Sequence, residues 1–194
     1  IGQVYDYKVK LKTINNNDFS TKYSDIFKFC ETYDQNNIYQ YEVDVFDGEN
    51  HLNRKVKSRY VKKEKRFRMD IGERQKLKGA LNHPVIYLGL RRLFPLAQEI
   101  DGSINTYKHS LSPSEERFYE ENAKSIFVML EENIIPETVK SPNKEFLAMH
   151  TKKYSNLGNS AGQDNIGQII TAILSFRRLS EKSGYTGGIL LIDE

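Results

Sequence analysis

The strongest constraint on folding lies in residues 188–194, where an unbroken aliphatic run ends in two acidic residues. Residues 189–192 lack the polar alternation of a half-exposed strand, which predicts a central parallel strand covered on both faces. Asp193 and Glu194 follow at its carboxyl end. Because ligands of open α/β sheets bind at the carboxyl ends of strands, this acidic pair favours metal and water chemistry. An acidic turn after a structural strand is the alternative interpretation.

A polar turn at residues 159–164 opens a second pattern. Ser160, Gly162 and Gln163 precede Asp164 there, and a helical period follows in Ile166, Ile169, Ile170, Ile173, Leu174, Phe176 and Leu179. The first turn of a helix has unpaired N–H groups, so a glycine and a hydroxyl beside them favour an anion site. Asp164 fits the same helix start as a cap near the positive end of the dipole. An ordinary capped helix is the alternative.

The order of these features resembles the second half of an ABC-type ATPase head. The turn at Ser160 is similar to the signature motif of that superfamily, and residues 189–194 are similar to its Walker B strand. With residues 85–96 upstream, the chain also resembles standalone prokaryotic AAA-family or SMC-like ATP-binding proteins, some of which act in DNA transactions or anti-phage defence. The resemblance implies an α/β fold, a partial ABC-type head with a mixed sheet, an antiparallel β region and a helical arm.

The resemblance also implies a role for each matching residue. Asp193 would hold Mg²⁺, and Glu194 would be the catalytic residue that activates water to attack ATP. The signature-like turn would contact ATP held by a second copy, through Ser160, Ala161, Gly162 and Gln163, so that a homodimer closes around ATP. Gln98 is the candidate for the glutamine of the Q-loop. Arg91 and Arg92 lie at a strand end, where phosphate, an acidic partner or a salt bridge would suit them.

Departures from the family pattern bear on activity. Asn159 stands in place of the usual leading leucine, and Ala161 stands in place of a glycine. No Gly-x-x-x-x-Gly-Lys-Ser/Thr occurs, so the phosphate-binding P-loop is missing. We therefore expect an internal segment of a longer protein, cut after the P-loop and within the Walker B region, and inactive as an ATPase by itself.

Three regions are predicted along the chain. Residues 1–100 form a strand-rich lobe with a basic hairpin, since residues 39–45 and 66–71 alternate between apolar and polar. Residues 101–150 form a helical arm, which begins at a capping serine, Ser112, and breaks at two prolines, Pro136 and Pro142. Residues 151–194 carry the signature-like helix and the Walker B strand.

The basic hairpin suggests a second partner. Its candidate nucleic-acid contacts are Arg59, Lys62, Lys63 and Arg66. Interleaved aromatic residues, Tyr60 and Phe67, favour stacking on bases beside contacts to phosphates. The alternative is a solvated hairpin whose cations face Glu42, Asp44 and Asp47 across the strands.

Composition narrows the class of protein. A lone cysteine, Cys30, cannot form an internal disulfide, and no apolar run approaches the length of a membrane helix, so we expect a cytoplasmic protein without membrane contact. The four histidines have no metal-ligand spacing, and a net charge of +3 identifies no partner. Besides the ATPase, two other functions fit the sequence: a nucleic-acid-binding module and a non-catalytic ATPase-like scaffold.

Overall fold

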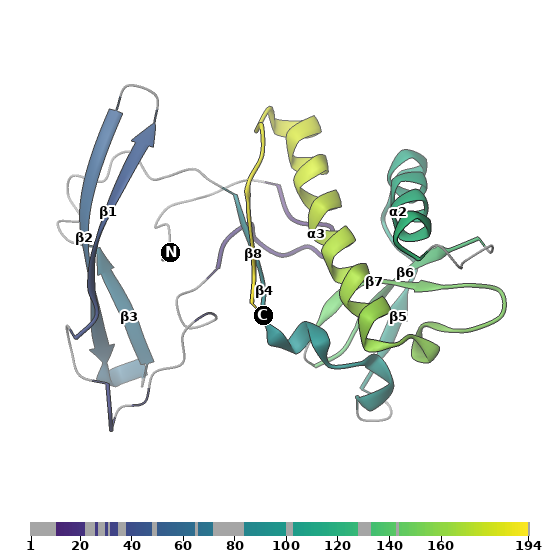
Figure 1. Ribbon diagram of the computed structural model, residues 1–194, viewed down its shortest axis with the longest axis horizontal. Helices are drawn as coiled ribbons and strands as arrows, with labels where there is room; N and C mark the ends of the chain where they lie inside the picture. The colour runs from purple at the N-terminus through teal and green to yellow at the C-terminus, as the bar shows by residue number, and fades with distance from the viewer. Residues whose placement is uncertain are drawn as a thin grey trace. The chain divides into compact units, whose positions relative to one another are not determined.

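The computed structural model describes residues 11–21, 26, 30, 32–34, 38–47, 50–64, 66–71, 84–99, 103–127, 133–142 and 144–193. Contacts divide the chain into two units. The first unit comprises Ile1–Lys8 and Ser20–Asn82, and the second comprises Val9–Phe19 and His83–Glu194. Strands and helices together give a mixed α/β fold, as predicted (Figure 1).

The first unit contains a three-stranded antiparallel sheet in the order β1–β2–β3. Its strands are β1 (Gln40–Asp47), β2 (Asn50–Val61) and β3 (Arg66–Ile71), and a short 3₁₀ helix, η1 (Lys62–Glu64), joins the last two. β2 alternates between burial and exposure, since Val56 and Ser58 are buried while Lys55 and Lys57 are exposed. The alternation predicted for residues 39–45 and 66–71 falls mainly on side chains outside the described part of the structure.

The second unit is built around another antiparallel sheet, in the order β5–β6–β7. These strands are β5 (Asn105–Tyr107), β6 (Ile135–Lys140) and β7 (Glu145–His150). A 23-residue helix, α3 (Ala161–Ser183), packs against β7, and α2 (Pro113–Ile126) lies beside α3 (Figure 1). The helices use one face of β7, through Leu147 and Met149, while Phe146 and Ala148 pack with Leu96 on the other face.

Helix α3 is held on β7 by hydrogen bonds as well as by apolar contacts. The amide of Leu147 donates to the hydroxyl of Thr171 at 3.0 Å, and the carbonyl of Leu147 accepts from Tyr119 on α2 at 2.7 Å. Ser175 on α3 accepts from the amide of Ile14 at 3.0 Å. Since all three bonds are buried, they fix α3 on β7, α2 on β7 and the segment at Ile14 on α3.

A parallel pair of strands brings distant parts of the sequence together. β4 (Val85–Leu88) pairs with β8 (Ile189–Ile192), from Val85 opposite Ile189 to Leu88 opposite Ile192. The predicted parallel strand at 189–192 is confirmed. Our expectation that it is covered on both faces is wrong for the described residues, because Ile189 and Ile192 are 40% and 41% exposed. β8 pairs only with β4 in the described sheet, so its aliphatic run is half-covered.

In its described residues, the segment predicted as a helical arm, 101–150, contains one helix and three strands. The helix start is as predicted: the side chains of Ser112 and Glu115 form a capping box, and Pro113 occupies the first turn. Pro136 lies within β6 rather than breaking the chain. β5 pairs only with residues 138–140, so β6 has a single neighbouring strand at Pro136, where a proline is tolerated.

Short 3₁₀ helices connect these elements. η3 (Leu90–Leu93) and η4 (Leu96–Gln98) follow β4, and η5 (Asn156–Gly158) precedes α3. Among the residues that the structure describes, no helix is both long and apolar enough to cross a membrane.

Candidate functional site

Ser160 caps α3. Its hydroxyl oxygen accepts from the amide of Gln163 at 3.2 Å, and the side-chain carbonyl of Gln163 accepts from the amide of Ser160 at 2.8 Å. These two bonds make a capping box. A capped helix was the alternative expected from the sequence, although with Asp164 as the cap. The Gln163 amide group also donates to the Tyr154 hydroxyl at 3.3 Å. Ser160 remains exposed at the helix start, and its hydroxyl proton is available to a further acceptor.

Helix α3 contains two glycines, and packing requires a glycine at only one of the two positions. A Cβ on Gly167 would lie 2.6 Å from the carbonyl oxygen of Leu147, so the close approach of α3 to β7 requires glycine there. A Cβ on Gly162 would meet only the hydroxyl of Ser160, at 3.7 Å. Gly162 is exposed and lies in the first turn of the helix. Packing within the described chain therefore does not require a glycine at position 162.

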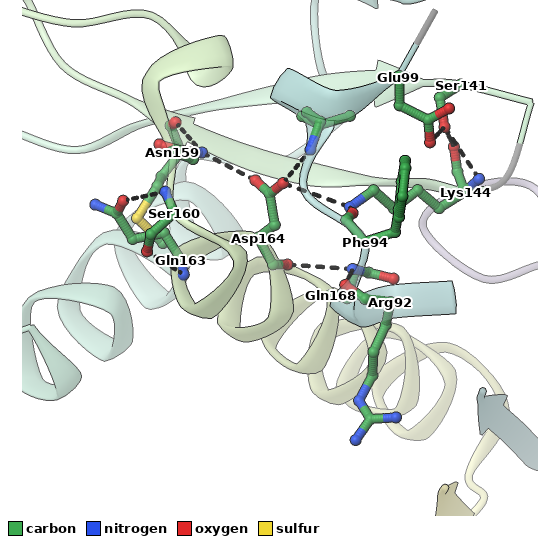
Figure 2. Close-up of polar contacts among 12 residues, drawn as sticks. Arg92, Phe94, Glu99, Ser141, Lys144, Asn159, Ser160, Gln163, Asp164 and Gln168 are labelled. Atoms are coloured by element: carbon green, nitrogen blue, oxygen red, sulfur yellow. Dashed lines mark hydrogen bonds and ion pairs between the residues drawn. The ribbon is translucent and has the colours of Figure 1, made fainter. Parts of the chain in front are cut away.

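The prediction that Asp164 caps the helix is wrong, because Ser160 is the cap and the carboxylate of Asp164 bonds to other segments. Its side chain is fully buried, and one carboxylate oxygen accepts from the amide of Leu96 at 2.8 Å and from the ammonium of Lys144 at 3.4 Å. The other oxygen accepts from Asn159 at 3.3 Å. Figure 2 shows Asp164 between Asn159 and Lys144. Asp164 thus joins the first turn of α3 to η4 and to β7.

Lys144 is the buried cation of this cluster, with 4% of its side chain exposed. Burial lowers the pKa of its ammonium group, and the nearby carboxylate of Asp164 acts in the opposite direction. The ammonium also donates to the carbonyl of Phe94. The role of Lys144 could not be predicted from the sequence, because its partners lie far away along the chain and no local pattern indicates a buried cation.

Asp193 lies at the carboxyl ends of β4 and β8. Its amide donates to the carbonyl of Leu88 at 3.0 Å, and one carboxylate oxygen accepts from the Tyr87 hydroxyl at 3.1 Å. In the described part of the chain the other oxygen, Oδ1, accepts no hydrogen bond. A half-buried carboxylate with one available oxygen suits Mg²⁺, which in phosphate sites takes one or two carboxylates. Glu194, the predicted catalytic residue, lies outside the described residues.

Arg92 on η3 connects the two predicted motifs. Its guanidinium donates to the carbonyl of Asp193 through Nη1 and to the side chain of Asn165, on α3, through Nε at 3.0 Å. Its main-chain carbonyl accepts from Gln168 on the same helix at 3.0 Å (Figure 2). The structure therefore brings the Ser160 helix and the Asp193 strand end into one unit with a shared residue between them.

Gln98, the candidate for the Q-loop, is exposed at the end of η4. Its backbone amide donates to the carbonyl of Pro95 at 3.1 Å. η4 is attached to α3 through the bond from Leu96 to Asp164. Gln98 therefore belongs to a loop held against the first turn of the helix that Ser160 caps.

The candidate nucleic-acid contacts lie in the first unit. Arg59 is exposed on β2, Lys62 and Lys63 are exposed on η1, and Arg66 begins β3 opposite Val61. The two aromatic residues, Tyr60 and Phe67, face each other on the opposite side of the sheet, with ring centroids 5.1 Å apart, and Phe67 is buried. Stacking of bases between these cations and aromatics, as the sequence suggested, is therefore incompatible with the sheet register.

Some acids of the hairpin face its cations, as the alternative interpretation expected. Glu42 lies opposite Lys55 and pairs with it at 3.2 Å. Asp44 accepts from His51 at 2.7 Å. Further along β2, Arg59 lies opposite another cation, Arg68. The described structure of the hairpin thus has a mixed end near β1 and a more cationic end near η1.

No family model matches this chain, and no curated protein or solved structure matches it either. Within the described ranges, no group of three or more His, Cys, Asp or Glu side chains is placed to hold a metal ion. The function proposed for this chain therefore rests on the residues and contacts described above.

Proposed function

We propose that this chain is part of an ABC-type, SMC-like ATPase head that binds and hydrolyses ATP and dimerises around it. The main support is a single arrangement: the helix capped by Ser160 and the strand that ends at Asp193 belong to one unit, with Arg92 bonded to both. Ligands of α/β proteins bind at such strand ends, and anions bind at helix starts.

Asp193 is the proposed ligand of Mg²⁺, through the carboxylate oxygen that does not bond to Tyr87. The bound ion would neutralise charge on the ATP phosphates. Glu194 is the proposed general base, which takes a proton from the water that attacks the γ-phosphate. Asp193 is held in place as the proposed Mg²⁺ ligand by the Tyr87 hydroxyl and by its backbone bond to Leu88.

The turn formed by Ser160, Ala161, Gly162 and Gln163 is proposed to close over ATP bound by a second copy. Gly162 supports this role, because an exposed glycine in a helix costs up to about 1 kcal/mol relative to alanine and the packing in the described chain does not require it. A phosphate could approach the backbone closely there. The Ser160 hydroxyl could donate to that phosphate while its oxygen still accepts from Gln163. Gln98 remains a proposed Mg²⁺-sensing residue.

The activity is tested by ATP turnover in the natural full-length protein. We expect Asp193→Asn and Glu194→Gln each to lower kcat by about 100-fold or more, as loss of a metal ligand or general base does. The control is Glu181→Gln, which removes a carboxylate with 54% of its side chain exposed, at the other end of α3. Turnover that is equal in all four proteins would refute the assignment of Asp193 and Glu194. Dimerisation with Mg-ATP without any turnover would instead indicate the non-catalytic scaffold.

The proposed setting of the ATPase is a DNA transaction or anti-phage defence in the cytoplasm.

The second candidate function is the binding of nucleic-acid phosphates. The observation that favours it is a group of cations near η1: Lys62 and Lys63 are exposed, and the register pairs Arg59 with Arg68. Such a group of cations attracts the phosphates of a polyanion. Phosphate contacts, rather than base stacking, fit a face whose aromatic residues lie on its other side.

Salt dependence tests this second function. Neutralising Lys62 and Lys63 to glutamine should weaken binding to a labelled DNA duplex and reduce the slope of log affinity against log salt by about one per lost contact. The matched control neutralises two exposed lysines of the second unit, Lys152 and Lys182. An equal effect of both pairs would argue against a site on the hairpin.

A further inference from the structure

Arg92 is a buried arginine whose hydrogen bonds all go to neutral acceptors in the described part of the chain. Only 6% of the residue is exposed. Nη1 donates to the carbonyls of Leu88 at 3.3 Å, of Gly89 at 3.4 Å and of Asp193. Nε donates to Asn165 at 3.0 Å. A buried cation is costly, and here the bonds connect elements rather than cancel the charge.

A second arginine, Arg178 on α3, differs from Arg92 because it pairs with a carboxylate. Arg178 donates from Nε and Nη2 to the carboxylate of Glu115, at 2.7 and 2.9 Å. This bidentate pair is the arrangement that stabilises a partly buried guanidinium. Arg92 has the same rigid fork but divides it between a strand end and a helix, which a lysine could not do at one time.

The backbone of Asp193 is held from both sides by this network. Its amide donates to Leu88, and its carbonyl accepts from Arg92. The carbonyl of Leu88 accepts from both Asp193 and Arg92. A displacement of the Asp193 peptide therefore changes the position of the guanidinium directly.

The segment that carries Arg92 is attached to α3 at two places. At η3, Gln168 donates to the main-chain carbonyl of Arg92. At η4, the amide of Leu96 donates to the buried carboxylate of Asp164. Both contacts lie in the first two turns of α3. Residues 90–98 and the start of α3 are thus expected to move together.

From this geometry we infer that Arg92 is a positioning residue that couples the Asp193 strand end to the first turns of α3. The inference rests on the proposed function for its purpose: events at Asp193 would change the helix start that presents Ser160 to ATP on a second copy. Coupling would pass through Asn165 and Gln168. Because these contacts are made within the chain itself, the coupling can be measured with or without nucleotide.

Hydrogen exchange without nucleotide is the first measurement. Asn165→Ala removes the helix acceptor of Arg92, and we expect the Asp193 amide, on the strand end, to exchange about fivefold faster, the factor for one net hydrogen bond. Arg92→Gln should speed exchange both there and in residues 164–168. The matched control is Arg178→Gln, which should affect α2 and the second half of α3 but not Asp193. Unchanged exchange at Asp193 in Asn165→Ala would overturn the inference, even if Arg92→Gln fails to fold.

Mg-ATP provides the second measurement, in the full-length protein. In the wild type we expect Mg-ATP to slow exchange in residues 161–168. Arg92→Gln and Arg92→Lys, each measured at a Mg-ATP concentration that saturates it, should lose this slowing. A saturated variant that keeps the slowing would contradict the coupling. If the wild type does not bind Mg-ATP, the proposed function fails, and the measurement without nucleotide decides the role of Arg92 by itself.

Discussion

At the scale of single residues, the first two turns of α3 contain some residues that packing requires and others that it does not. Gly167 is required by the carbonyl of Leu147, while a Cβ on Gly162 would make only an ordinary contact with the Ser160 hydroxyl. Asp164 is buried and Ser160 is exposed, only four residues apart. The exposed side of this helix start carries the residues assigned to ATP, and the buried side carries those that hold the helix in place.

Alanine substitutions at the two glycines should therefore have opposite effects on stability. We expect Gly162→Ala to raise the free energy of unfolding by up to about 1 kcal/mol, because alanine is the better helix former. Gly167→Ala should lower it by about 1–3 kcal/mol, because the new methyl group overlaps the β7 backbone. Chemical denaturation measures both. In the dimerisation assay described below, Gly162→Ala should be impaired despite its stability; a stable variant that still dimerises normally would remove the role assigned to Gly162.

The ion pair between Glu115 and Arg178 predicts a pH dependence of stability. Hydrogen bonds from Arg178 lower the pKa of Glu115 from 4.5 to about 2. Because the folded-state pKa is the lower one, the stabilisation is complete above pH 4.5 and is lost as the pH falls towards 2. It amounts to about 3 kcal/mol, from 1.36 kcal/mol for each pKa unit between 4.5 and about 2.

Unfolding of the wild type and of Glu115→Gln, compared between pH 6 and pH 2, checks this prediction. The wild type should be more stable at about pH 6, and the two stabilities should converge towards about pH 2 as the carboxylate is protonated. A difference that stays constant over this range would mean that the carboxylate charge does not stabilise the fold.

At the scale of elements, a buried cluster fixes α3 relative to β7 and η4. Asp164 is fully buried, and Lys144 has 4% of its side chain exposed. Removing one partner of a buried pair leaves the other charge without compensation. Asp164 also accepts from the amide of Leu96, so its loss leaves an unsatisfied donor.

Asp164→Ala should accordingly lower the free energy of unfolding by about 3–5 kcal/mol. The double variant Asp164→Ala with Lys144→Met should lose less, because no ammonium group remains buried. The control is Glu120→Gln, which breaks a more exposed pair with Lys124 and should cost about 0.5 kcal/mol or less. Denaturant titration of all variants provides the comparison. If Asp164→Ala were no more destabilising than Glu120→Gln, the cluster would not anchor α3.

Elements that depend on local sequence were predictable. The starts of α2 and α3 follow from Ser112 with Glu115 and from Ser160 with Gln163, since each capping box lies within four residues. The strands of the hairpin follow from alternation. The three strands β5, β6 and β7 were not predicted, because their pairing joins separate segments and because Pro136 suggested a break.

The candidate site was predictable to a similar extent. Ser160 and Asp193 carry their patterns in the adjacent sequence. The burial of Asp164 was not predictable, since it depends on Leu96 and Lys144, which reach it only in the folded chain. The bonds of Arg92 to Asn165 and Asp193 likewise join residues that are far apart in the sequence.

At the scale of the whole molecule, the two units carry different candidate sites. The second unit holds the α3 start, the Asp193 strand end and the residue between them. The first unit presents a cationic sheet face. In the proposed ATPase, the second unit would carry out the nucleotide cycle, and the first unit would be the place to look for a nucleic-acid partner.

The central claim is that the Asp193 strand end of one copy and the Ser160 turn of a second copy serve the same nucleotide. Sedimentation of the full-length protein carrying Glu194→Gln, with and without Mg-ATP, tests it most directly. We predict a dimer with Mg-ATP and a monomer without it, and we predict that adding Ser160→Arg abolishes the dimer while the fold stays intact. Sedimentation that Mg-ATP does not change, or a dimer that persists with Ser160→Arg, would contradict the claim.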